Sequence, residues 1–367
     1  MEIKIKKDEF LKGLYLAQSI ADRKSTMPIL ANALIRSEGK DSIVCAATDL
    51  RVSVVAESKA EVLEEGGLSI TAKHLFDIIK NVPGQDIHFK KTENNWAEIT
   101  SGKAHYQVVG MSSRDFPRLP DHSELEFVEV DAKVFCEMIS KTIFSVSTDE
   151  TRRHLSGILM EWSGSNATMV STDGHRLSKI EMELGEGLNL EEGVIIPRKG
   201  LLEIRRLLDG LEGSCDLGLK DGNLVIRAKD VVLTIKLVDS KFPPYDQVVP
   251  KSNDKQIVLD RLLFLDSLKR ISIMSSDRNK GIRIDLEPGQ LRVSSDNPDL
   301  GEAHEDLDID YDGEKLSIGF DARYFLDILN EIDDENVTLE FSGELDPGLV
   351  RPEKSDKYIG VVMPMRL

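Results

Sequence analysis

The residues best suited to chemistry lie in one short run, Thr172-Asp173-Gly174-His175-Arg176-Leu177. A carboxylate can hold an imidazole in the orientation that proton transfer needs, so Asp173 and His175 are candidates for a general acid–base pair. An Asp that follows a strand is also a common turn-former. The run therefore admits two interpretations, an acid–base centre or a structural turn.

The same pattern recurs in the chain, and the recurrence favours the turn. Strand-like segments end in a hydroxyl residue followed by Asp at three places: Thr48-Asp49, Thr172-Asp173 and Ser295-Asp296. Asp49 and Asp296 thus take the place of Asp173, yet no histidine stands two residues after them. Only Gly174-His175-Arg176-Leu177 is peculiar to the middle copy, and we expect any special task there.

No other residues have the spacing of a catalytic or metal site. The histidines lack metal-ligand spacing on one helix face, and there is no phosphate-cradling Gly-rich loop, nucleophile elbow or Cys-x-x-Cys. The run 308–313 matches the start of a calcium loop, but its twelfth position is Gly319 instead of Glu. Leu307, Ile309 and Tyr311 alternate with acids, which predicts a strand with one solvated face. We expect no metal site, and the absence of catalytic motifs argues against an enzyme without excluding one.

The cysteines and the N-terminal residues bear on the cellular compartment. Cys45, Cys136 and Cys215 are far apart and have apolar neighbours, which predicts small buried side chains in a reducing environment. Residues 1–7 alternate charged and apolar groups instead of forming a signal peptide, and no apolar run is long enough to span a bilayer. These features predict a soluble, cytoplasmic protein.

The charge balance limits the choice of partners. The 367 residues include 47 basic and 65 acidic ones, a formal net charge of −18. Such a deficit argues at face value against nucleic acid, which attracts basic proteins. A protein can nevertheless gather its cations on one surface while the remainder stays acidic. Net charge alone therefore does not exclude nucleic acid as a partner, and the distribution of the cations has to be considered.

The most informative feature of the sequence is a threefold internal repeat. The Thr/Ser-Asp blocks are spaced by 124 and 123 residues, and a short helical block, with acids at Asp77, Glu203 and Asp327, recurs at 126 and 124. Each copy closes with proline: Phe116-Pro117, Phe242-Pro243 and Met363-Pro364. Three unrelated blocks in the same order at one interval indicate a triplicated structural unit.

Each copy has the same order of periodicities. Apolar residues at helical spacing predict an opening helix at 8–21, 131–145 and 260–275, and a second helix at 72–81, 199–208 and 322–331. Strand-like runs joined by turns at 37–40, 163–165 and 288–289 predict hairpins. The order helix, strands, helix, strands gives each copy two similar halves. We predict an α+β fold of three tandem domains, 1–125, 126–253 and 254–367, with helices gathered on one face of antiparallel sheets.

These blocks resemble a known family. The triplicated unit, the run 172–177, Val194-Ile195-Ile196-Pro197-Arg198-Lys199-Gly200, Lys236-Leu237-Val238-Asp239 with Phe242-Pro243, and Val361-Val362-Met363-Pro364-Met365-Arg366-Leu367 are similar to the bacterial DNA polymerase III beta subunit, the sliding clamp. The likeness runs the whole length of the chain. It implies a head-to-tail homodimer that closes a helix-lined ring around duplex DNA, tethers the polymerase, and has neither catalytic activity nor a cofactor.

The resemblance also implies site residues. Positions that match the family's DNA contacts, or carry cations on the predicted helices, are Arg23, Lys24, Lys73, Arg152, Arg153, His154, Arg198 and Lys199. Positions that match its pocket for short linear motifs of the polymerase alpha subunit, the clamp loader and other polymerases and repair proteins are Leu155, Thr172, Gly174, His175, Arg176, Leu177, Pro243, Val248, Tyr324, Val361, Met363, Pro364, Met365 and Arg366. Positions that match its dimer contacts are Tyr106, Val108, Ile273 and Met274. The chain departs from well-known relatives at Gln247, where a basic residue is common.

Two alternatives from other classes remain open at this stage. An acidic hydrolase that uses Asp173 and His175 would lose turnover when the histidine is replaced. A generic three-domain scaffold would share the repeat without forming a ring. Phosphate contacts carry no sequence information, so a clamp on DNA needs no base-reading residues.

Overall fold

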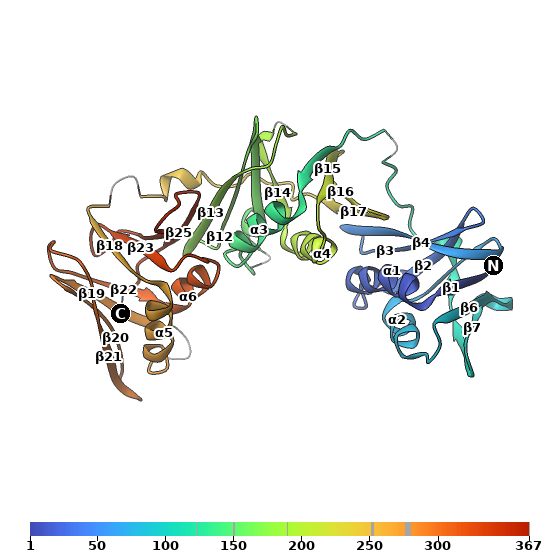
Figure 1. The fold of residues 1–367 in the computed structure, drawn as a ribbon, viewed down its shortest axis with the longest axis horizontal. Coiled ribbons are helices and arrows are strands. Elements are labelled where there is room, and N and C mark those ends of the chain that lie inside the picture. The colour runs from blue at the N-terminus through green and yellow to red at the C-terminus, as the bar shows by residue number, and fades with distance from the viewer. Residues whose placement is uncertain (123, 150, 189, 251–252, 276–279, 367) are drawn as a thin grey trace. The chain divides into compact units, whose positions relative to one another are not determined.

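The computed structural model describes residues 1–122, 124–149, 151–188, 190–250, 253–275 and 280–366 (Figure 1). The described helices longer than one turn of 3-10 geometry are α1 (Lys7–Ile20), α2 (Ala72–Asn81), α3 (Ala132–Ile143), α4 (Arg198–Leu208), α5 (Arg261–Ile271) and α6 (Ala322–Asn330). Each predicted helix is present, with ends that differ by a few residues. The largest difference is in α5, which ends at Ile271 instead of Ser275.

The helices form where apolar residues recur at three- and four-residue intervals. In α1 the buried residues include Phe10, Leu14 and Ala17, which share one face. In α4 the buried set includes Leu201, Ile204 and Leu208, while Arg205 on the opposite face is exposed. Asp260 caps α5 by accepting a hydrogen bond from the backbone N–H of Leu263 at 2.7 Å.

The strands surround these helices in a repeated order. In the first predicted domain they are β1 (Glu2–Lys6), β2 (Asn32–Glu38), β3 (Ser42–Thr48), β4 (Val52–Glu64), β5 (Gly67–Thr71), β6 (Asp86–Lys91), β7 (Trp96–Ser101), β8 (Ala104–Val109) and β9 (Met111–Ser112). In the second they are β10 (Val128–Asp131), β11 (Gly157–Ser163), β12 (Asn166–Thr172), β13 (Arg176–Glu183), β14 (Leu190–Pro197), β15 (Ser214–Lys220), β16 (Asn223–Ala228) and β17 (Val231–Lys236). In the third they are β18 (Lys255–Asp260), β19 (Gly281–Glu287), β20 (Gln290–Asn297), β21 (Gly301–Asp308), β22 (Leu316–Asp321), β23 (Asn336–Phe341), β24 (Gly348–Pro352) and β25 (Tyr358–Val362).

Apart from the short β9, the strands and helices follow one rule. Every half of a domain is a strand, a helix and three further strands, as in β1-α1-β2-β3-β4 and β5-α2-β6-β7-β8. The sequence prediction of helix, strands, helix, strands missed the strand that opens each half. Those opening strands are four to eight residues long and run directly into the following helix, so no turn residue announces them.

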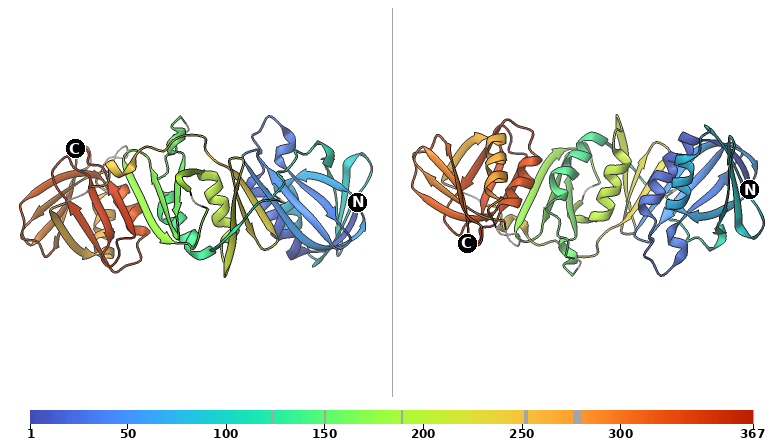
Figure 2. Two further views of the ribbon diagram at one scale, coloured as in Figure 1. Left: turned by 90° about the horizontal axis from the view of Figure 1, so that it is seen from above. Right: turned by 90° about the horizontal axis from the view of Figure 1, so that it is seen from below.

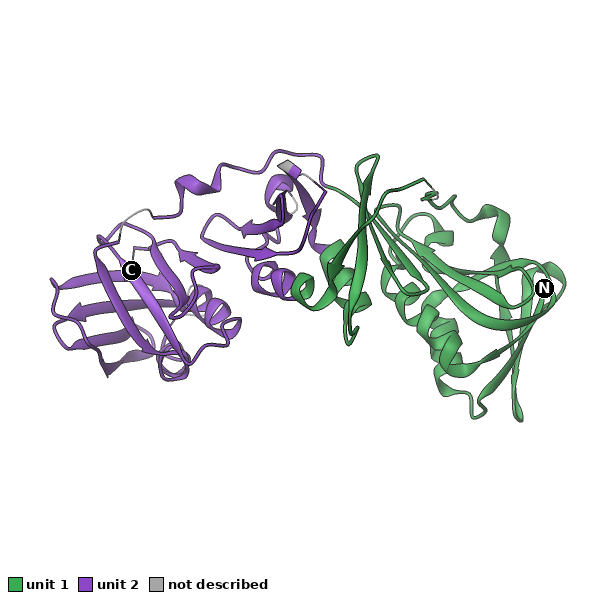
Figure 3. Ribbon diagram, turned by 45° about the horizontal axis from the view of Figure 1, so that its top comes forward, with its two compact units in different colours: residues 1–136, 199–237 green, residues 137–198, 238–367 purple. Residues whose placement is uncertain are grey.

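The chain divides into two compact units (Figure 3). Unit 1 comprises Met1–Cys136 and Lys199–Leu237, and unit 2 comprises Glu137–Arg198 and Val238–Leu367. Within the described residues of unit 1, a sheet runs β10-β15-β16-β17-β4-β1-β6-β7-β8, with β2, β3, β5 and β9 attached. In unit 2 one sheet runs β14-β11-β12-β13-β25-β24-β23-β18 and another runs β21-β20-β19-β22.

Helices cover one face of these sheets. In unit 1, α1 packs on β3 and β4 and lies beside α2, as the views in Figure 2 also show. The small residues Gly13 and Ala56 bring this helix close to the sheet, because a Cβ added at Gly13 would stand 2.9 Å from Cβ of Cys45. In unit 2, α5 lies against α6 and contacts β20 and β21.

Two predicted domains are joined in each case by pairing between the last strands of two halves. In unit 1, β4 pairs with β17, and the register places Ser53 opposite Thr234. In unit 2, β13 pairs with β25, and the register places Leu177 opposite Val361. Each of these strands is the last of its half, and both pairings are antiparallel. The last strand of a first half thus joins the last strand of the next domain's second half.

Several smaller predictions can be checked against the strands. The predicted hairpins are present as β2–β3, β11–β12 and β19–β20. The predicted strand through Tyr311 is wrong at its end, because β21 stops at Asp308 and Tyr311 donates a hydrogen bond from its hydroxyl to the Glu314 carbonyl at 2.6 Å. Among the described residues no cluster of His, Cys, Asp or Glu could hold a metal ion.

The cysteine prediction is confirmed at two positions and wrong at the third. Cys45 and Cys215 are buried, and burial raises the pKa of each thiol to about 12. Cys136 on α3 is only half-buried, and desolvation raises the pKa of its thiol. Within the described part of the chain, no helix has the length and apolar character that crossing a membrane requires.

Candidate functional site

The run 172–177 forms the turn between β12 and β13. The hydroxyl of Thr172 accepts a hydrogen bond from the Gly174 N–H at 3.1 Å and donates to the Arg176 carbonyl at 2.6 Å. Gly174 has φ +91°, the left-handed region where glycine is favoured. The turn thus closes through local hydrogen bonds and one conformationally free residue.

The Asp173 carboxylate belongs to this turn and not to an acid–base pair. Its Oδ1 accepts hydrogen bonds from the backbone N–H of His175 at 2.9 Å and of Arg176 at 3.1 Å. Its Oδ2 accepts from Nε of Arg176 at 3.1 Å. All of its bonds among the described residues thus go to backbone amides and to a guanidinium, and none reaches the imidazole.

Arg176 is the centre of a compact network in unit 2. Its guanidinium donates to the carboxylates of Asp173 and Asp327 and to the Phe144 carbonyl, the last at 2.6 Å. Cζ lies 4.9 Å from the centre of the Tyr324 ring and 5.3 Å from that of Phe144, which is cation–π geometry. The side chain is 11% exposed. It ties the turn after β12 to helix α6.

His175 presents its ring on the surface beside this network. It is exposed and stacks on Tyr324, with ring centres 6.3 Å apart and planes inclined by 10°. The Tyr324 ring is half-buried, and desolvation raises the pKa of its hydroxyl. His175 and Arg176 also line a cavity of about 270 Å³ together with Arg152 and Arg198. Asp149 and Asp173 line the same cavity, so its wall carries charges of both signs, with Phe144 as an aromatic member.

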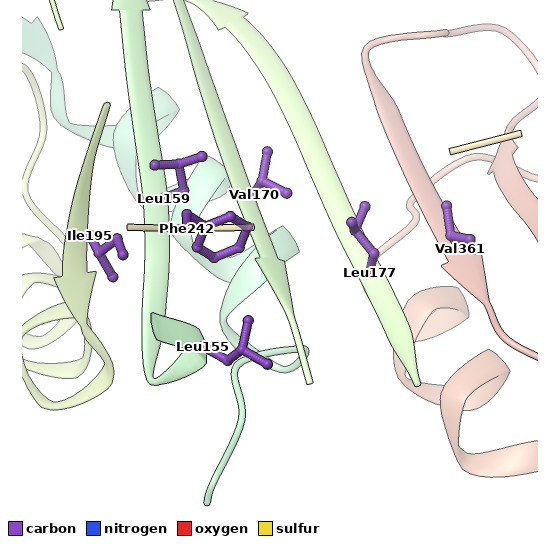
Figure 4. Packing of buried hydrophobic residues seen from close by; sticks show 7 residues of the cluster. All are labelled: Leu155, Leu159, Val170, Leu177, Ile195, Phe242 and Val361. Carbon is purple, nitrogen blue, oxygen red and sulfur yellow. The ribbon is translucent and has the colours of Figure 1, made fainter. Parts of the chain in front are cut away.

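An apolar cluster lies on the other face of the same strands (Figure 4). It contains Leu155, Leu159, Val170, Leu177, Ile195, Phe242 and Val361. In the figure the Phe242 ring lies across the strands that carry Leu159 and Val170. Val238, Tyr245 and Val249 pack against its margin.

The structure brings most of the predicted peptide-pocket residues into these two groups. Leu155, Leu177 and Val361 are buried in the apolar cluster, and Pro243 adjoins Phe242 in sequence and is half-buried. Val248 is 40% exposed just after the short helix 245–247 that contains Gln247. The remaining positions lie in the turn, on α6 or in the segment that follows β25.

That last segment is held to unit 2 by its backbone. Met363 donates its N–H to the His175 carbonyl at 2.9 Å, and Met365 donates to the Gly319 carbonyl at 2.8 Å. Met363, Pro364 and Met365 are half-buried and Arg366 is exposed, while Leu367 lies outside the described residues. Residues 363–366 do not continue the last strand, because β25 ends at Val362.

Sequence reasoning missed two contributors. Tyr245 donates its hydroxyl to Glu161 at 2.7 Å, and burial raises the pKa of that hydroxyl. Phe144 supplies both a carbonyl and a ring to Arg176. The aromatic spacing in Phe242-Pro243-Pro244-Tyr245 is a signal that could have pointed to Tyr245. Phe144 follows an amphipathic helix and carries no such signal.

The predicted DNA-binding cations fall into two classes. Lys73 pairs with Asp77 at 3.0 Å, Lys199 pairs with Asp49, and Arg152 pairs with Asp149 at 3.3 Å. Arg23, Lys24 and Arg153 are exposed, and among the described residues no carboxylate is paired with them; the same holds for Arg198. His154 is half-buried in the short helix 153–155. The four residues in unpaired positions are the better placed for phosphate.

The predicted dimer residues lie on one edge strand and just after a helix. Tyr106 and Val108 are on β8, which pairs only with β7 among the described strands. Ile273 and Met274 follow α5, and Ile273 is 71% exposed. Strand β21 likewise has one described neighbour, β20.

The third Thr/Ser-Asp block requires a correction of one residue. Both β11–β12 and β19–β20 turn through two residues, from Ser163 to Asn166 and from Glu287 to Gln290. The seventh residue after Asn166 is Asp173, and the seventh residue after Gln290 is Asn297. Asn297 indeed accepts the N–H two residues later, that of Asp299, at 3.0 Å. Asn297, and not Asp296, is therefore the counterpart of Asp173.

Comparison with known proteins agrees with this architecture. Family models of the DNA polymerase III beta subunit match residues 1–120 with the N-terminal domain, 129–244 with the central domain and 246–366 with the C-terminal domain. The beta sliding clamps of Pseudomonas putida and Escherichia coli K12 are each 33% identical, over 368 and 371 residues, and 100% of both chains is covered.

Solved structures give the same result. The chain matches the sliding clamp, DNA polymerase III subunit beta, of Bartonella birtlesii bound to griselimycin with a TM-score of 0.95 and 32% identity. It matches the DNA polymerase sliding clamp of Pseudomonas aeruginosa with a TM-score of 0.93 and 32% identity. All chains are covered to 100%. The chain therefore belongs to the bacterial DNA polymerase III beta subunit family, the beta sliding clamps.

Proposed function

We propose that this chain is a non-catalytic DNA sliding clamp, in which two copies associate head to tail, close a ring around duplex DNA and tether a DNA polymerase. The single observation that carries the proposal is the regular way in which domains are joined. Strand β4 of the first domain pairs with β17 of the second, and β13 of the second pairs with β25 of the third. By the same rule, β21 of the third domain should pair with β8 of a first domain. Among the described strands, β21 pairs only with β20 and β8 only with β7.

A second copy of the chain supplies that β8. A head-to-tail contact repeated by one rotation closes into a ring, and three domains per chain taken twice give six positions. The exposed edges support the idea, because uncovered strand edges with apolar side chains invite association. Val109 on β8 is 63% exposed, and Leu300 just before β21 is also exposed. We place Tyr106, Val108, Ile273 and Met274 in this dimer interface.

The ring would hold DNA through phosphate contacts without reading sequence. Arg23, Lys24, Arg153 and Arg198 are the residues we favour for direct contact. Lys73, Lys199 and Arg152 already have carboxylate partners, so we assign them a weaker, screened contribution. His154 completes the set.

We further propose that the partner-peptide site consists of the predicted pocket residues, from Leu155 to Arg366. An apolar cluster bordered by a few polar groups is the usual form of a peptide site. His175, Tyr324 and Val248 would contact the peptide directly, and Leu177 and Val361 would form the floor. Arg176 would act by holding the turn. The methionines of the segment 363–366 suit partners of varied sequence.

Three further points complete the proposal. We divide the chain into domains at 1–125, 126–253 and 254–367, in line with the repeat; Ser123 and Ser252, which lie close to these bounds, are outside the described residues. We place the protein in the cytoplasm, where chromosomal DNA is replicated. No cofactor takes part, and the hydrolase alternative loses its basis because Asp173 is bonded to the turn.

The test is topological. The protein is loaded by a clamp loader onto nicked circular DNA, and the circle is then cut once by a restriction enzyme. We expect the protein to remain on circles and to leave after linearisation, because free ends let a ring slide off. A DNA with both ends blocked by bound protein is the control and should retain it. Persistence on linear DNA with free ends would overturn the proposal.

A further inference from the structure

The two junctions inside the chain share one register, and this register can be extended to the junction between protomers. At the first, Ser53 lies opposite Thr234 and Val55 opposite Val232. At the second, Leu177 lies opposite Val361 and Lys179 opposite Ile359. Ser53 and Leu177 are equivalent because they pair with Thr48 and Thr172, which end the neighbouring strands. The two junctions therefore superpose residue for residue.

The corresponding residues of the free edges follow from their own hairpins. Asp296 is the counterpart of Thr172, and it lies opposite Glu302 in the β20–β21 pair. Glu302 is therefore the counterpart of Leu177. In β7–β8 the turn spans two residues from Ser101 to Ala104, as β16–β17 does from Ala228 to Val231. Ala104 is therefore the counterpart of Val231, and Gln107 is that of Thr234.

We infer that β21 pairs with β8 of the partner subunit in this same register, which sets His304 directly opposite His105 of the partner subunit. Glu302 then lies opposite the partner's Gln107, and Ala303 lies opposite the partner's Tyr106. The inference rests on the proposed head-to-tail dimer and adds its register and its titratable pair. Both histidines are exposed in the single chain, so neither has to be uncovered.

The burial pattern supports the extension. Leu307 is buried and Glu305 accepts hydrogen bonds from Arg270 of α5 at 2.6 and 3.0 Å, so odd-numbered residues of β21 face the helices. Leu233, the counterpart of Tyr106, is likewise buried. The register thus places Tyr106 and Ala303 on the helix side and the two histidines on the outer side. A slip by one residue would bring opposite faces together.

The charged groups around the histidine pair determine its response to pH. Next to His105 is Thr100, whose hydroxyl oxygen is 3.3 Å from Nδ1, and next to His304 is Ser294. The diagonal neighbours from β21 are Glu302 and Asp306, and Asp306 is already held by Arg292 at 2.6 Å. Those from the partner are Gln107, which donates to Glu98 at 3.2 Å, and Lys103.

Protonation of both imidazoles would weaken the interface. Directly opposite side chains have Cβ atoms about 5 Å apart and diagonal ones about 7 Å, so the repulsion between the two cations exceeds the attraction of Glu302 for His105 of the partner subunit. Lys103 adds to the repulsion. Histidine gains its charge as pH falls from 8 to 5, so the dimer is tightest at neutral and alkaline pH.

Disulfide trapping tests the register. Three double variants combine His105→Cys with Glu302→Cys, His304→Cys or Asp306→Cys, and the wild-type chain with its three native cysteines is the background. Under mild oxidation we expect the covalent dimer to form fastest with His304→Cys. Fastest trapping with either neighbouring position, or no trapping in a chain that is dimeric by light scattering, would overturn the register. A chain that is monomeric throughout would overturn the proposed function as well.

Sedimentation of the wild-type chain at pH 8 and pH 5.5 tests the pair itself. A ring contains two histidine pairs. We therefore expect the dissociation constant of the dimer to be about twofold to thirtyfold higher at pH 5.5 than at pH 8. His304→Gln should reduce that rise, while His74→Gln, an exposed histidine on α2, should not. A pH response that is the same in all three proteins would reject the histidine pair while leaving the trapped register intact.

Discussion

The turn after β12 and its counterpart after β3 differ in their side chains, but the same backbone groups are hydrogen-bonded in both. Asp49 accepts the N–H groups of Arg51 at 2.8 Å and Val52 at 2.6 Å, just as Asp173 accepts those two and three residues later. Leu50 has φ +72° where Gly174 has φ +91°. The fold is indifferent to the exposed residues at this turn, so the middle copy is free to place a histidine there.

The two turns should respond oppositely to mutation, because one has a glycine and the other a leucine at the position with positive φ. Gly174→Ala should lower the free energy of unfolding by about 1 kcal/mol, because a Cβ is disfavoured at positive φ. That Cβ would also stand 3.1 Å from Nη1 of Arg152. Leu50→Gly should leave the free energy within about 0.5 kcal/mol or raise it, since strain is relieved. Urea denaturation measures both, and equal losses would contradict the shared-turn interpretation.

Neighbouring residues 175 and 176 have separable roles. The Arg176 side chain is largely buried between two rings, with carboxylates on both sides. Arg176→Ala leaves Asp173 and Asp327 without their cation and should cost about 3 kcal/mol of stability. His175→Ala removes an exposed ring and should change stability by less than about 0.5 kcal/mol.

The same pair of variants separates folding from peptide binding. A polymerase-derived peptide should bind His175→Ala about fivefold more weakly, because a ring contact is worth about 1 kcal/mol. Calorimetric binding and thermal unfolding provide the two measurements, and Arg153→Ala, an exposed cation outside the cluster, is the matched control. Full peptide affinity in His175→Ala would remove this residue from the site.

At the scale of elements, the link between the first two predicted domains is a strap fixed to the sheet of unit 1. Its described residues within 116–127 form no regular strand or helix. Leu125 fills the space over Gly218, where an added Cβ would stand 2.7 Å from its Cδ2. Phe127 stacks under Arg227, with Cζ 4.2 Å from the ring centre. The strap is therefore packed onto strands β15 and β16 of unit 1 by its side chains.

His122 makes this strap sensitive to pH. Its Nε2 is 2.8 Å from the Thr234 hydroxyl, and its buried Nδ1 has no partner among the described residues. Desolvation lowers the pKa of His122, and Lys220 acts in the same direction while Asp121 opposes both. The folded state therefore binds fewer protons than the unfolded state, and stability falls as pH drops below about 6.5.

We expect His122→Gln to flatten that dependence, because an amide can keep the bond to Thr234 without titrating. The free energy of unfolding is measured at pH 7.5 and pH 5.5, and proteolysis of residues 116–127 reports on the strap itself. His74→Gln keeps His122 and should retain the full pH dependence. An unchanged slope in His122→Gln would place the titrating group elsewhere.

The sequence predicted helices better than it predicted strands. Helical periodicity in a segment such as 72–81 is a local property, so α2 has the predicted bounds. The strands that open each half were missed because they merge with the next helix. Asp296 was taken as the equivalent of Asp173 because a Ser-Asp pair imitates Thr-Asp, and only the hairpin register reveals the offset. Register depends on partners distant in sequence and cannot be read from one strand.

The candidate site was predictable to a similar degree. The aliphatic residues Leu155, Leu177 and Val361 were named on resemblance, and they do share one apolar cluster. The role of Arg176 was not foreseen, because its partners Phe144 and Asp327 come from two different helices or their ends. Such a network is a product of the tertiary structure. A motif can therefore mark a site without distinguishing its supports from its contacts.

At the scale of the whole molecule, the acidic balance of −18 has to be reconciled with DNA. Many cations on the helices are neutralised by acids on the same helix, as in Lys12–Glu9, Lys141–Glu137 and Lys269–Asp266. Few are left for phosphate, and equilibrium affinity for DNA should be low. A clamp can tolerate this, because a closed ring stays on DNA through topology and not through affinity.

A ring held on DNA by topology should give two different responses to salt. Equilibrium binding to a short linear duplex should weaken steeply between about 50 and 200 mM NaCl, because each phosphate contact releases a counterion. Retention on a closed circle after loading should change little over the same range. Fluorescence anisotropy measures the first, and gel filtration of the loaded circles measures the second.

The cations that have no carboxylate partner among the described residues should determine how steeply binding to the linear duplex weakens with salt. Replacing Arg153 and Arg198 together by Ala should reduce the salt slope by about two contacts, as expected when each removed cation releases one counterion fewer. Replacing Lys73 should reduce it by less, since Asp77 already neutralises that ammonium group at 3.0 Å. Retention on circles should survive all three substitutions, because none lies on the strand edges assigned to the dimer. Equal losses of slope and retention in the Arg153 and Arg198 variant would mean that charge, and not closure, holds the protein on DNA.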